Sequence, residues 1–331
     1  MRTPQAFTII WTIVFTMIVA ALFMEAGEAR FAGPAVAAEL APAGPSRQVP
    51  VFRAGVDLVN VGVTVTDKKG NLVLGLTAED FELSEDGRKQ TIRYFAPGGD
   101  GANGGPVMHL GMLLDVSESM GDDIKFTRTA AIKFLNTLTD AVDVTVVDFD
   151  TEVRAARYGQ NEFARLVERI RQQKTTGMTA LYDAVGLYLD GAGGQEGRKV
   201  MLLYTDGGDT QSSLRFNELV DLLKASDATV YAIGALEHQS GFGRDRARSI
   251  LQTIASTTGG QAFFPTSVKD LEQMYDKVVA EIRAQYTIGY VSTNARSDGA
   301  WRKVEIKSTA KDSRDVNVRA RKGYYGPYKK P

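Results

Sequence analysis

The sequence predicts an α/β fold: a doubly wound, mainly parallel sheet with an accessory β-sandwich built from flanking N- and C-terminal strands. Between residues 107 and 283, short apolar stretches typical of buried strands alternate with segments of helical periodicity. Repeated strand and helix units favour a parallel sheet with helices on both faces. Strand patterns alone occupy residues 51–96 and 284–331, and each segment is too short to bury a core by itself. We therefore expect the two segments to pack together as one sandwich of about seven strands.

The α/β domain is predicted to span residues 107–283. Residues 108–114 are mostly apolar, as in a strand buried on both faces of a sheet. Residues 152–158 follow another strand across Asp150 and Thr151, and we expect them to form an antiparallel edge strand. Strands are predicted at residues 108–114, 142–149, 152–158, 199–205, 229–233 and 262–264. Helices are predicted at residues 124–138, 163–170, 181–189, 216–226, 245–257 and 268–283.

The flanking segments show the two-residue alternation of half-buried strands. Every second residue from Val59 to Val65 is valine, and strands at residues 81–84 and 90–95 flank an Asp-Gly hairpin signal. In the C-terminal segment, strands are predicted at residues 287–290, 301–307 and 316–320. Residues 319–330 hold five cations and no acids, so we expect a solvated end that protects a sheet edge.

The chain begins with a segment suited to export. Residues 6–24 are uncharged and mainly apolar, so we predict that residues 1–38 form a signal peptide or an N-terminal anchor. The small residues at 35–38 favour cleavage by a signal peptidase. The apolar run would reach about 28 Å as a helix, which also suits an anchor. We favour cleavage, and either alternative places the remaining chain outside the cytoplasm: periplasmic, secreted, or anchored facing the outside of the inner membrane.

Two further segments carry neither strand nor helix patterns. Residues 39–50 contain three prolines and are predicted to be a spacer. Residues 97–106 are rich in glycine and include the pattern G-x-G-x-x-G. A dinucleotide-binding loop with that pattern should follow a strand and open a helix, whereas Pro106 and another strand come next here. We therefore expect a flexible linker.

The composition excludes several kinds of chemistry. The 331 residues include 39 Lys and Arg against 40 Asp and Glu, so no charge bias favours nucleic acid, and only the N-terminal segment suggests a membrane. Cysteine is absent, which excludes disulfides, zinc–thiolate clusters and thiol catalysis. The two histidines, His109 and His238, have no spacing partner, and we expect one to be packed and the other exposed. Motifs of serine hydrolases, nucleotide hydrolases and zinc proteases are missing.

Oxygen-bearing side chains follow the first strand of the α/β domain, in the sequence Asp115-Val116-Ser117-Glu118-Ser119. Thr179 precedes the helix predicted at residues 181–189, and Asp206 follows the strand predicted at residues 199–205. Loops that leave the carboxyl ends of parallel strands line one crevice, so these oxygens can converge. Hard oxygen ligands suit Mg²⁺, Mn²⁺ or Ca²⁺. The first motif alone would also suit an ordinary helix cap.

The three motifs resemble the metal-ion-dependent adhesion site (MIDAS) of the von Willebrand factor type A (vWA) family, which has a Rossmann-like sheet. That site combines Asp-x-Ser-x-Ser, a Gly-x-Thr loop and a Thr-Asp-Gly turn. The matching metal ligands are Asp115, Ser117, Ser119, Thr179 and Asp206. The resemblance implies a divalent cation, Mg²⁺ with Mn²⁺ or Ca²⁺ as alternatives, bound by the hydroxyls in its inner shell and by the aspartates directly or through water. The layout, including Gly-Tyr-Tyr-Gly-Pro at residues 323–327, also resembles exported bacterial proteins described as "VWFA-related".

The resemblance implies binding without catalysis. Two carboxylates only neutralise a dication, and Mg²⁺ keeps open positions when protein ligands are few, so an outside carboxylate can complete its shell. We therefore expect metal-dependent protein–protein interaction or adhesion through an acidic residue of a protein partner. Glu118 occupies a position that is often Gly in the family, and its charge either repels acidic ligands or supplies an internal one. In the family such contact can be coupled to movement of the last helix, here residues 268–283.

Two alternatives remain open. A metal-dependent hydrolase would need a general base near the ion. The candidate bases are Glu118, Asp148, Asp150, Asp183 and Asp209. Of these, Asp183 is expected instead to begin or cap its helix. In the second alternative the ion only stabilises the loops, and binding takes place elsewhere, on the sandwich.

Overall fold

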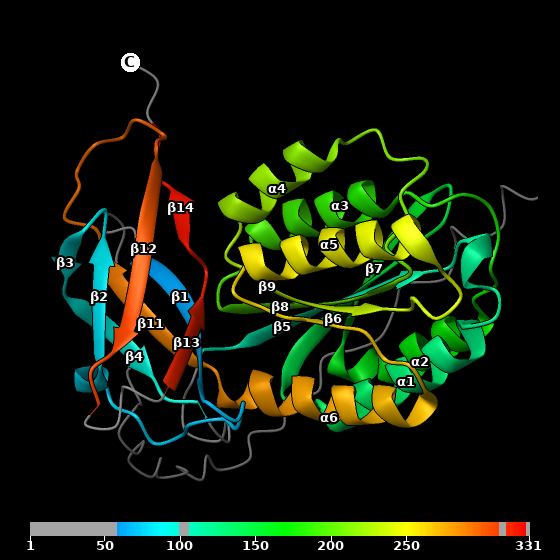
Figure 1. Cartoon of the computed structure of the whole chain (residues 1–331), viewed down its shortest axis with the longest axis horizontal. Coiled ribbons are helices and arrows are strands. Elements are labelled where there is room, and N and C mark those ends of the chain that lie inside the picture. The colour runs from blue at the N-terminus through cyan, green and yellow to red at the C-terminus, as the bar shows by residue number, and fades with distance from the viewer. Residues whose placement is uncertain (1–57, 99–105, 311–315, 329–331) are drawn as a thin grey trace, which may run out of the picture. The chain divides into compact units, whose positions relative to one another are not determined.

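The computed structural model describes residues 58–98, 106–310 and 316–328. The predicted signal peptide or anchor, the spacer and most of the glycine-rich linker lie outside these residues. Within the described ranges, no helix combines the length and the apolar character that crossing a membrane requires. Figure 1 shows the arrangement of the strands and helices.

A six-stranded sheet forms the centre of the α/β domain, in the order β10-β9-β8-β5-β6-β7. Its strands are β5 (Met108–Asp115), β6 (Ala141–Phe149), β7 (Val153–Gly159), β8 (Arg198–Thr205), β9 (Thr229–Gly234) and β10 (Ala262–Phe263). All neighbouring strands run parallel except β6 and β7, which are antiparallel. Every residue of β5 is buried, in accord with its apolar sequence. The predicted sheet type and the antiparallel edge strand are therefore confirmed.

Helices cover both faces of this sheet (Figure 1): α1, α2 and α6 lie on one face, and α3, α4 and α5 on the other. They are α1 (Ile124–Thr137), α2 (Phe163–Gln172), α3 (Leu181–Gly193), α4 (Phe216–Ala225), α5 (Gly241–Thr257) and α6 (Val268–Ala284). Short 3₁₀ helices are η1 (Ala78–Asp80), η3 (Glu118–Met120) and η4 (Gln160–Glu162). Helix α5 begins at Gly241, before the predicted residue 245. The prediction started too late because the glycines on either side of Phe242 have low helix propensity, although this turn is helical in the structure.

The flanking strands form two four-stranded antiparallel sheets, in the orders β13-β1-β11-β4 and β14-β12-β2-β3. The N-terminal strands are β1 (Leu58–Asp67), β2 (Phe81–Glu85), β3 (Arg88–Gln90) and β4 (Ile92–Ala96). The C-terminal strands are β11 (Tyr286–Val291), β12 (Trp301–Ser308), β13 (Val316–Ala320) and β14 (Gly323–Tyr325). One apolar cluster joins Val61 and Ile288 of the first sheet to Leu83 and Val304 of the second. Each sheet mixes strands from both segments, so the predicted accessory sandwich is confirmed.

The C-terminal tail differs from the prediction of a solvated end. Residues Gly323–Tyr325 form β14 at a sheet edge, paired with β12, and Gly323 and Tyr324 are buried. A Cβ on Gly323 would lie 2.3 Å from the carbonyl oxygen of Arg302, so only glycine allows this approach. The strand was missed because three residues among cations are too few to show an alternation.

A buried carboxylate lies inside the sandwich. Glu85 accepts hydrogen bonds from the hydroxyls of Tyr290 (2.8 Å), Ser292 (2.6 Å) and Tyr324 (2.9 Å). The guanidinium of Arg302, equally buried, lies 3.9 Å from Glu85. These residues come from β2 and from the C-terminal segment, so the network fastens the two ends of the described chain to each other.

We expect Glu85→Ala to lower the free energy of unfolding by about 3–5 kcal/mol, because a buried guanidinium would lose its counter-ion and three hydroxyls would lose their acceptor. Tyr290→Phe, which removes one donor and keeps the carboxylate, should cost only about 1 kcal/mol. Urea denaturation of the full chain measures both changes. Equal losses for the two variants would show that the carboxylate does not organise the network.

Candidate metal centre

The ends of two central strands place the first and last of the three predicted metal-binding motifs side by side. Strands β5 and β8 pair in parallel with Leu114 opposite Tyr204, so the turns after Asp115 and Thr205 leave the same edge of the sheet. The amide of Ala235, at the end of β9, donates to the carbonyl of Thr205 at 3.0 Å. Three loops therefore meet at this edge.

Asp115 is fully buried and organises the first loop. Its Oδ1 accepts hydrogen bonds from the amide of Ser117 (2.9 Å) and from the Ser117 hydroxyl (2.5 Å). Its Oδ2 accepts from the hydroxyl of Thr205 at 2.6 Å. The hydroxyls of Ser117 and Ser119 lie 3.2 Å apart. One carboxylate and three hydroxyls thus form a single cluster.

The electrostatics of Asp115 are unusual for this protein. Burial raises the pKa of its carboxyl to about 7, and the nearby Asp206 adds to the rise, although hydrogen bonds from Ser117 and Thr205 oppose it. No ion pair within the described residues involves Asp115 or Asp206. By contrast, the buried Asp148 and Asp150 are both paired with Arg154, each at 2.9 Å. The candidate site therefore gathers negative charge without a cationic side chain to balance it.

The loop that carries Thr179 is held by the turn between β6 and β7. The amide of Met178 donates to the Thr151 hydroxyl (2.9 Å), and the amide of Ala180 donates to the Asp150 carbonyl (2.8 Å). Gly177 has a φ of +70°, and a Cβ there would lie 2.3 Å from the Thr151 hydroxyl. This position therefore needs glycine.

The same loop is bonded to the Asp115 turn. The amide of Glu118 donates to the Gly177 carbonyl at 3.1 Å, and the amide of Thr176 donates to the Val116 carbonyl at 2.9 Å. The Thr179 amide donates to the Thr210 hydroxyl at 3.0 Å. These bonds bring the Gly-x-Thr loop against the Asp-x-Ser-x-Ser turn.

Asp206 completes the set. Its Oδ1 accepts from the amide of Gly208 at 2.9 Å, and its carbonyl accepts from the side chain of Gln239 at 2.9 Å. The structure thus brings together the loops of all five predicted ligands. Sequence reasoning missed the supporting residues Thr151, Thr205, Thr210 and Gln239. Only Thr205 carries a signal, since it belongs to the Thr-Asp-Gly motif.

The residues present fit a hard divalent cation. Two carboxylates and three hydroxyls are the oxygen ligands that Mg²⁺ and Mn²⁺ accept. Within the part of the chain that the structure describes, the Thr179 hydroxyl makes no hydrogen bond, which leaves its oxygen free to bind an ion. No group of three or more His, Asp or Glu among the described residues could hold a metal, so an ion bound here would need the hydroxyls as ligands.

The candidate general bases are engaged elsewhere, except Glu118, which is exposed. Asp148 and Asp150 bind arginines. Asp209 accepts hydrogen bonds from the Ser212 hydroxyl and the Tyr182 amide. The histidines behave as expected: His109 is buried against Asp143, and His238 is largely exposed, 3.8 Å from Asp123.

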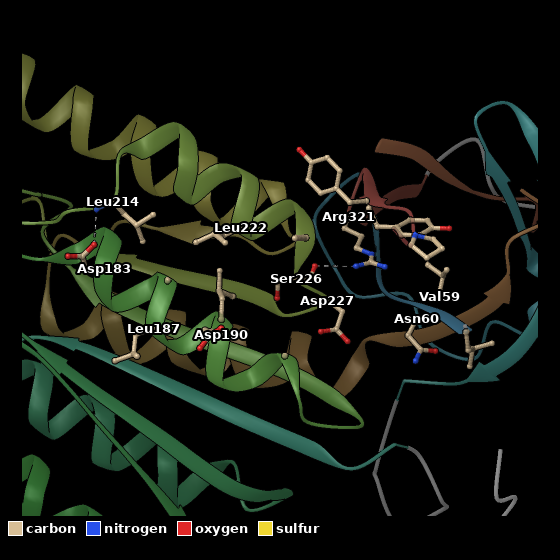
Figure 2. A pocket seen from close by; sticks show the side chains of 18 of the residues that line it. Val59, Asn60, Asp183, Leu187, Asp190, Leu214, Leu222, Ser226, Asp227 and Arg321 are labelled. Atoms are coloured by element: carbon tan, nitrogen blue, oxygen red, sulfur yellow. Dashed lines mark hydrogen bonds between the residues drawn. The ribbon is translucent and has the colours of Figure 1, made fainter. Parts of the chain in front are cut away.

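A separate groove of about 960 Å³ lies over α3 and α4, and none of the five predicted ligands lines it. Figure 2 shows Asp183 at one end of the groove, where its carboxylate accepts from the amide of Leu214 at 2.9 Å. Arg321 at the other end donates to the carbonyl of Ser226 at 3.2 Å. Asp183 lies in the first turn of α3, close to the predicted position, but its carboxylate accepts from amides of the loop before α4 and does not cap its own helix.

Residues 109–277 match the family model of the von Willebrand factor type A domain, and the chain belongs to this family. No curated protein sequence matches it significantly. The structure is similar to the PilB minor pilin from Streptococcus sanguinis, with a TM-score of 0.45 and 13% identity over 56% of this chain and 63% of the pilin. The chain thus spans less than two thirds of that protein.

Two other solved structures are similar at the same level. The von Willebrand factor type A protein from Catenulispora acidiphila has a TM-score of 0.44 and 14% identity over 83% of this chain and 76% of that one. The vWF domain of the type V pili tip protein Mfa5 from Porphyromonas gingivalis has a TM-score of 0.44 and 12% identity, over 53% of this chain and 96% of that one. These likenesses concern the fold alone.

The raised pKa of Asp115 predicts how the stability of the metal-free protein depends on pH. The folded carboxyl holds its proton up to a pH of about 7, whereas the unfolded one loses it near its ordinary pKa of 3.8. The unfolded carboxyl therefore releases its proton at lower pH than the folded one, and the free energy of unfolding should fall by about 2 kcal/mol between pH 5 and pH 7. Asp115→Asn should lack this contribution. Denaturation in chelator at several pH values tests it, and parallel curves for the two proteins would contradict it.

Proposed function

We propose that the chain is an exported binding protein that holds a divalent cation, most readily Mg²⁺, and grips a carboxylate of a protein partner through it. The proposed ligands are Asp115, Ser117, Ser119, Thr179 and Asp206. The single observation that carries the proposal is the fully buried Asp115 carboxylate, close to Asp206 and without a cationic partner among the described side chains. A buried charge is costly unless it is paired or coordinates a metal. A bound dication would supply that pairing.

The choice of ligands supports binding of an outside carboxylate. Serine and threonine hydroxyls donate no formal charge, so the ion would keep a strong attraction for a further anion. Ser119 and Met178, on the two loops beside the buried Asp115, are exposed and leave the site open to a partner. Membership of the vWA family fits protein–protein interaction or adhesion.

Hydrolysis is not favoured. Four of the five candidate bases are engaged in arginine pairs or in hydrogen bonds that cap loops. The remaining one, Glu118, is exposed, and water screens and hydrates it. Export rests on the N-terminal sequence, with a cleaved signal peptide or an anchor as the two routes to the outside of the inner membrane.

Metal binding is tested by titrating the full chain with Mn²⁺ in a calorimeter. Asp115→Ala and Thr179→Ala should each weaken binding by tenfold or more, because each removes a proposed ligand. Ser213→Ala is the matched control, since its side chain is exposed near the α4 end of the loop between β8 and α4, away from Asp206 at the start of that loop, and it should bind as the parent does. Circular dichroism checks that each variant is folded. Unchanged Mn²⁺ affinity in folded Asp115→Ala would refute the site.

Partner binding is tested by capture from the extracytoplasmic fraction, once in Mg²⁺ and once in chelator. We expect a protein that is retained only in Mg²⁺ and is lost with folded Asp115→Ala. If Mg²⁺ raises the melting temperature but the captured proteins are the same in chelator, the ion is purely structural.

A further inference from the structure

Two large apolar side chains are exposed on segments around the candidate metal centre, one on the Thr179 loop and one at the start of α5. Phe242 is 95% exposed and Met178 is 50% exposed. Single exposed apolar residues are common on protein surfaces, so exposure alone decides nothing. Their positions relative to the proposed ligands give them significance.

Met178 lies between Gly177 and the proposed ligand Thr179, so its Cα is about 3.8 Å from that of Thr179. Its amide donates to the Thr151 hydroxyl at 2.9 Å. This bond restrains the backbone of the loop and so opposes a rotation that would bury the Met178 side chain. The side chain is therefore held at the border of the metal centre, in solvent.

Phe242 lies in the first turn of α5, directly after the loop that follows β9. This loop is bonded to the metal centre, because the Gln239 side chain donates to the carbonyl of Asp206 at 2.9 Å. One turn further along α5, Ala247 lies so close to Gly207 that a Cβ on that glycine would approach it to 2.9 Å. Phe242 precedes Ala247 by five residues, about 7.5 Å toward the start of the helix and hence beyond the sheet edge.

The charges on these loops restrict the partner further. Glu118 and Asp122 on the loop after β5, and Glu237 on the loop after β9, are exposed and form no ion pair with any described residue. A partner with several neighbouring acids would be repelled by them, although one carboxylate could still bind the ion. Lys125 in α1, Lys174 on the Thr179 loop and Arg246 in α5 are also exposed, so the repulsion is partial.

We propose that Phe242, at the start of α5, and Met178, on the Thr179 loop, are the apolar anchors of the partner-binding surface around the metal centre. The partner is then a protein segment that presents a single carboxylate flanked by bulky apolar side chains, rather than a run of acids. An aromatic residue that is exposed in the free protein and covered in the complex is the kind of residue that dominates binding energy. The inference rests on the proposed function, since the carboxylate needs the ion.

The probes are synthetic peptides with a central Asp, labelled for fluorescence anisotropy. One has Leu and Phe beside the Asp, a second has Ser at both positions, a third has Glu at both, and a fourth replaces the Asp of the first by Asn. Each is titrated with the full chain in Mg²⁺ and in chelator. We expect the first peptide to bind at least tenfold more tightly than the second and third, and only in Mg²⁺.

The variants Phe242→Ser and Met178→Ser should each weaken binding of the first peptide, the former by about tenfold or more. Both should bind Mn²⁺ as the parent chain does. Val142→Ser, an exposed apolar residue on β6 at the opposite end of the sheet, is the control and should change neither reading.

Failure of this inference can be told apart from failure of the metal site. If Mn²⁺ binds but the peptides with apolar and with serine neighbours bind equally, or Phe242→Ser binds like the parent, the anchors are refuted. If Mn²⁺ binds and no peptide does, the proposed partner class is wrong. If Mn²⁺ does not bind, or the Asn peptide binds as well as the Asp peptide, the proposed function itself fails.

Discussion

The buried carboxylate of Asp115 is the constraint on which the edge of the central sheet depends. It lies at the end of a strand whose residues are all buried, and it accepts hydrogen bonds from Ser117 and Thr205. These donors lower the cost of its charge, but burial outweighs them and raises its pKa to about 7. The loops are thus arranged around an oxygen cluster that is only partly satisfied by the chain itself.

Elsewhere in the same domain, cationic side chains neutralise the buried acids. The lack of such a partner for Asp115 among the described residues is therefore meaningful. Asp148 and Asp150 at the end of β6 share Arg154 from the antiparallel edge strand β7. That pairing keeps the β6–β7 turn in one conformation. The backbone carbonyl of Asp150 and the hydroxyl of Thr151 can then fix the Thr179 loop. The neutralised acids therefore support the loops, and the unneutralised Asp115 and Asp206 are two of the ligands proposed for the ion.

Much of the fold could be predicted from the sequence because its signals are local. Apolar stretches of strand length and helical spacing give the elements of the α/β domain, and valine alternation gives β1. The sandwich could be predicted because neither flanking segment is long enough to bury a core alone. The motifs pointed to the five proposed ligands because two of them follow strand ends and the third directly precedes a helix.

The parts that were missed depend on contacts between distant residues. Gln239, which bonds the Asp206 carbonyl, and Thr151, which fixes Met178, belong to no motif, and nothing in their neighbourhood marks them. Strand β14 exists because Gly323 allows close approach to Arg302 and because Tyr324 reaches Glu85. Periodicity within a segment cannot show such pairings.

The last helix of the α/β domain is tied to several elements, which limits how a switch could work here. Arg283 donates to the carbonyl of Thr137 in α1 at 2.9 Å, and Glu281 is paired with Arg319 of β13. After Ala284, a single residue separates α6 from β11, which is an inner strand of its sandwich sheet. A displacement of α6 along its axis would therefore break these contacts and pull on β11. Any coupling between the metal centre and α6 in this chain must involve the sandwich as well, because the helix cannot move while β11 stays in place.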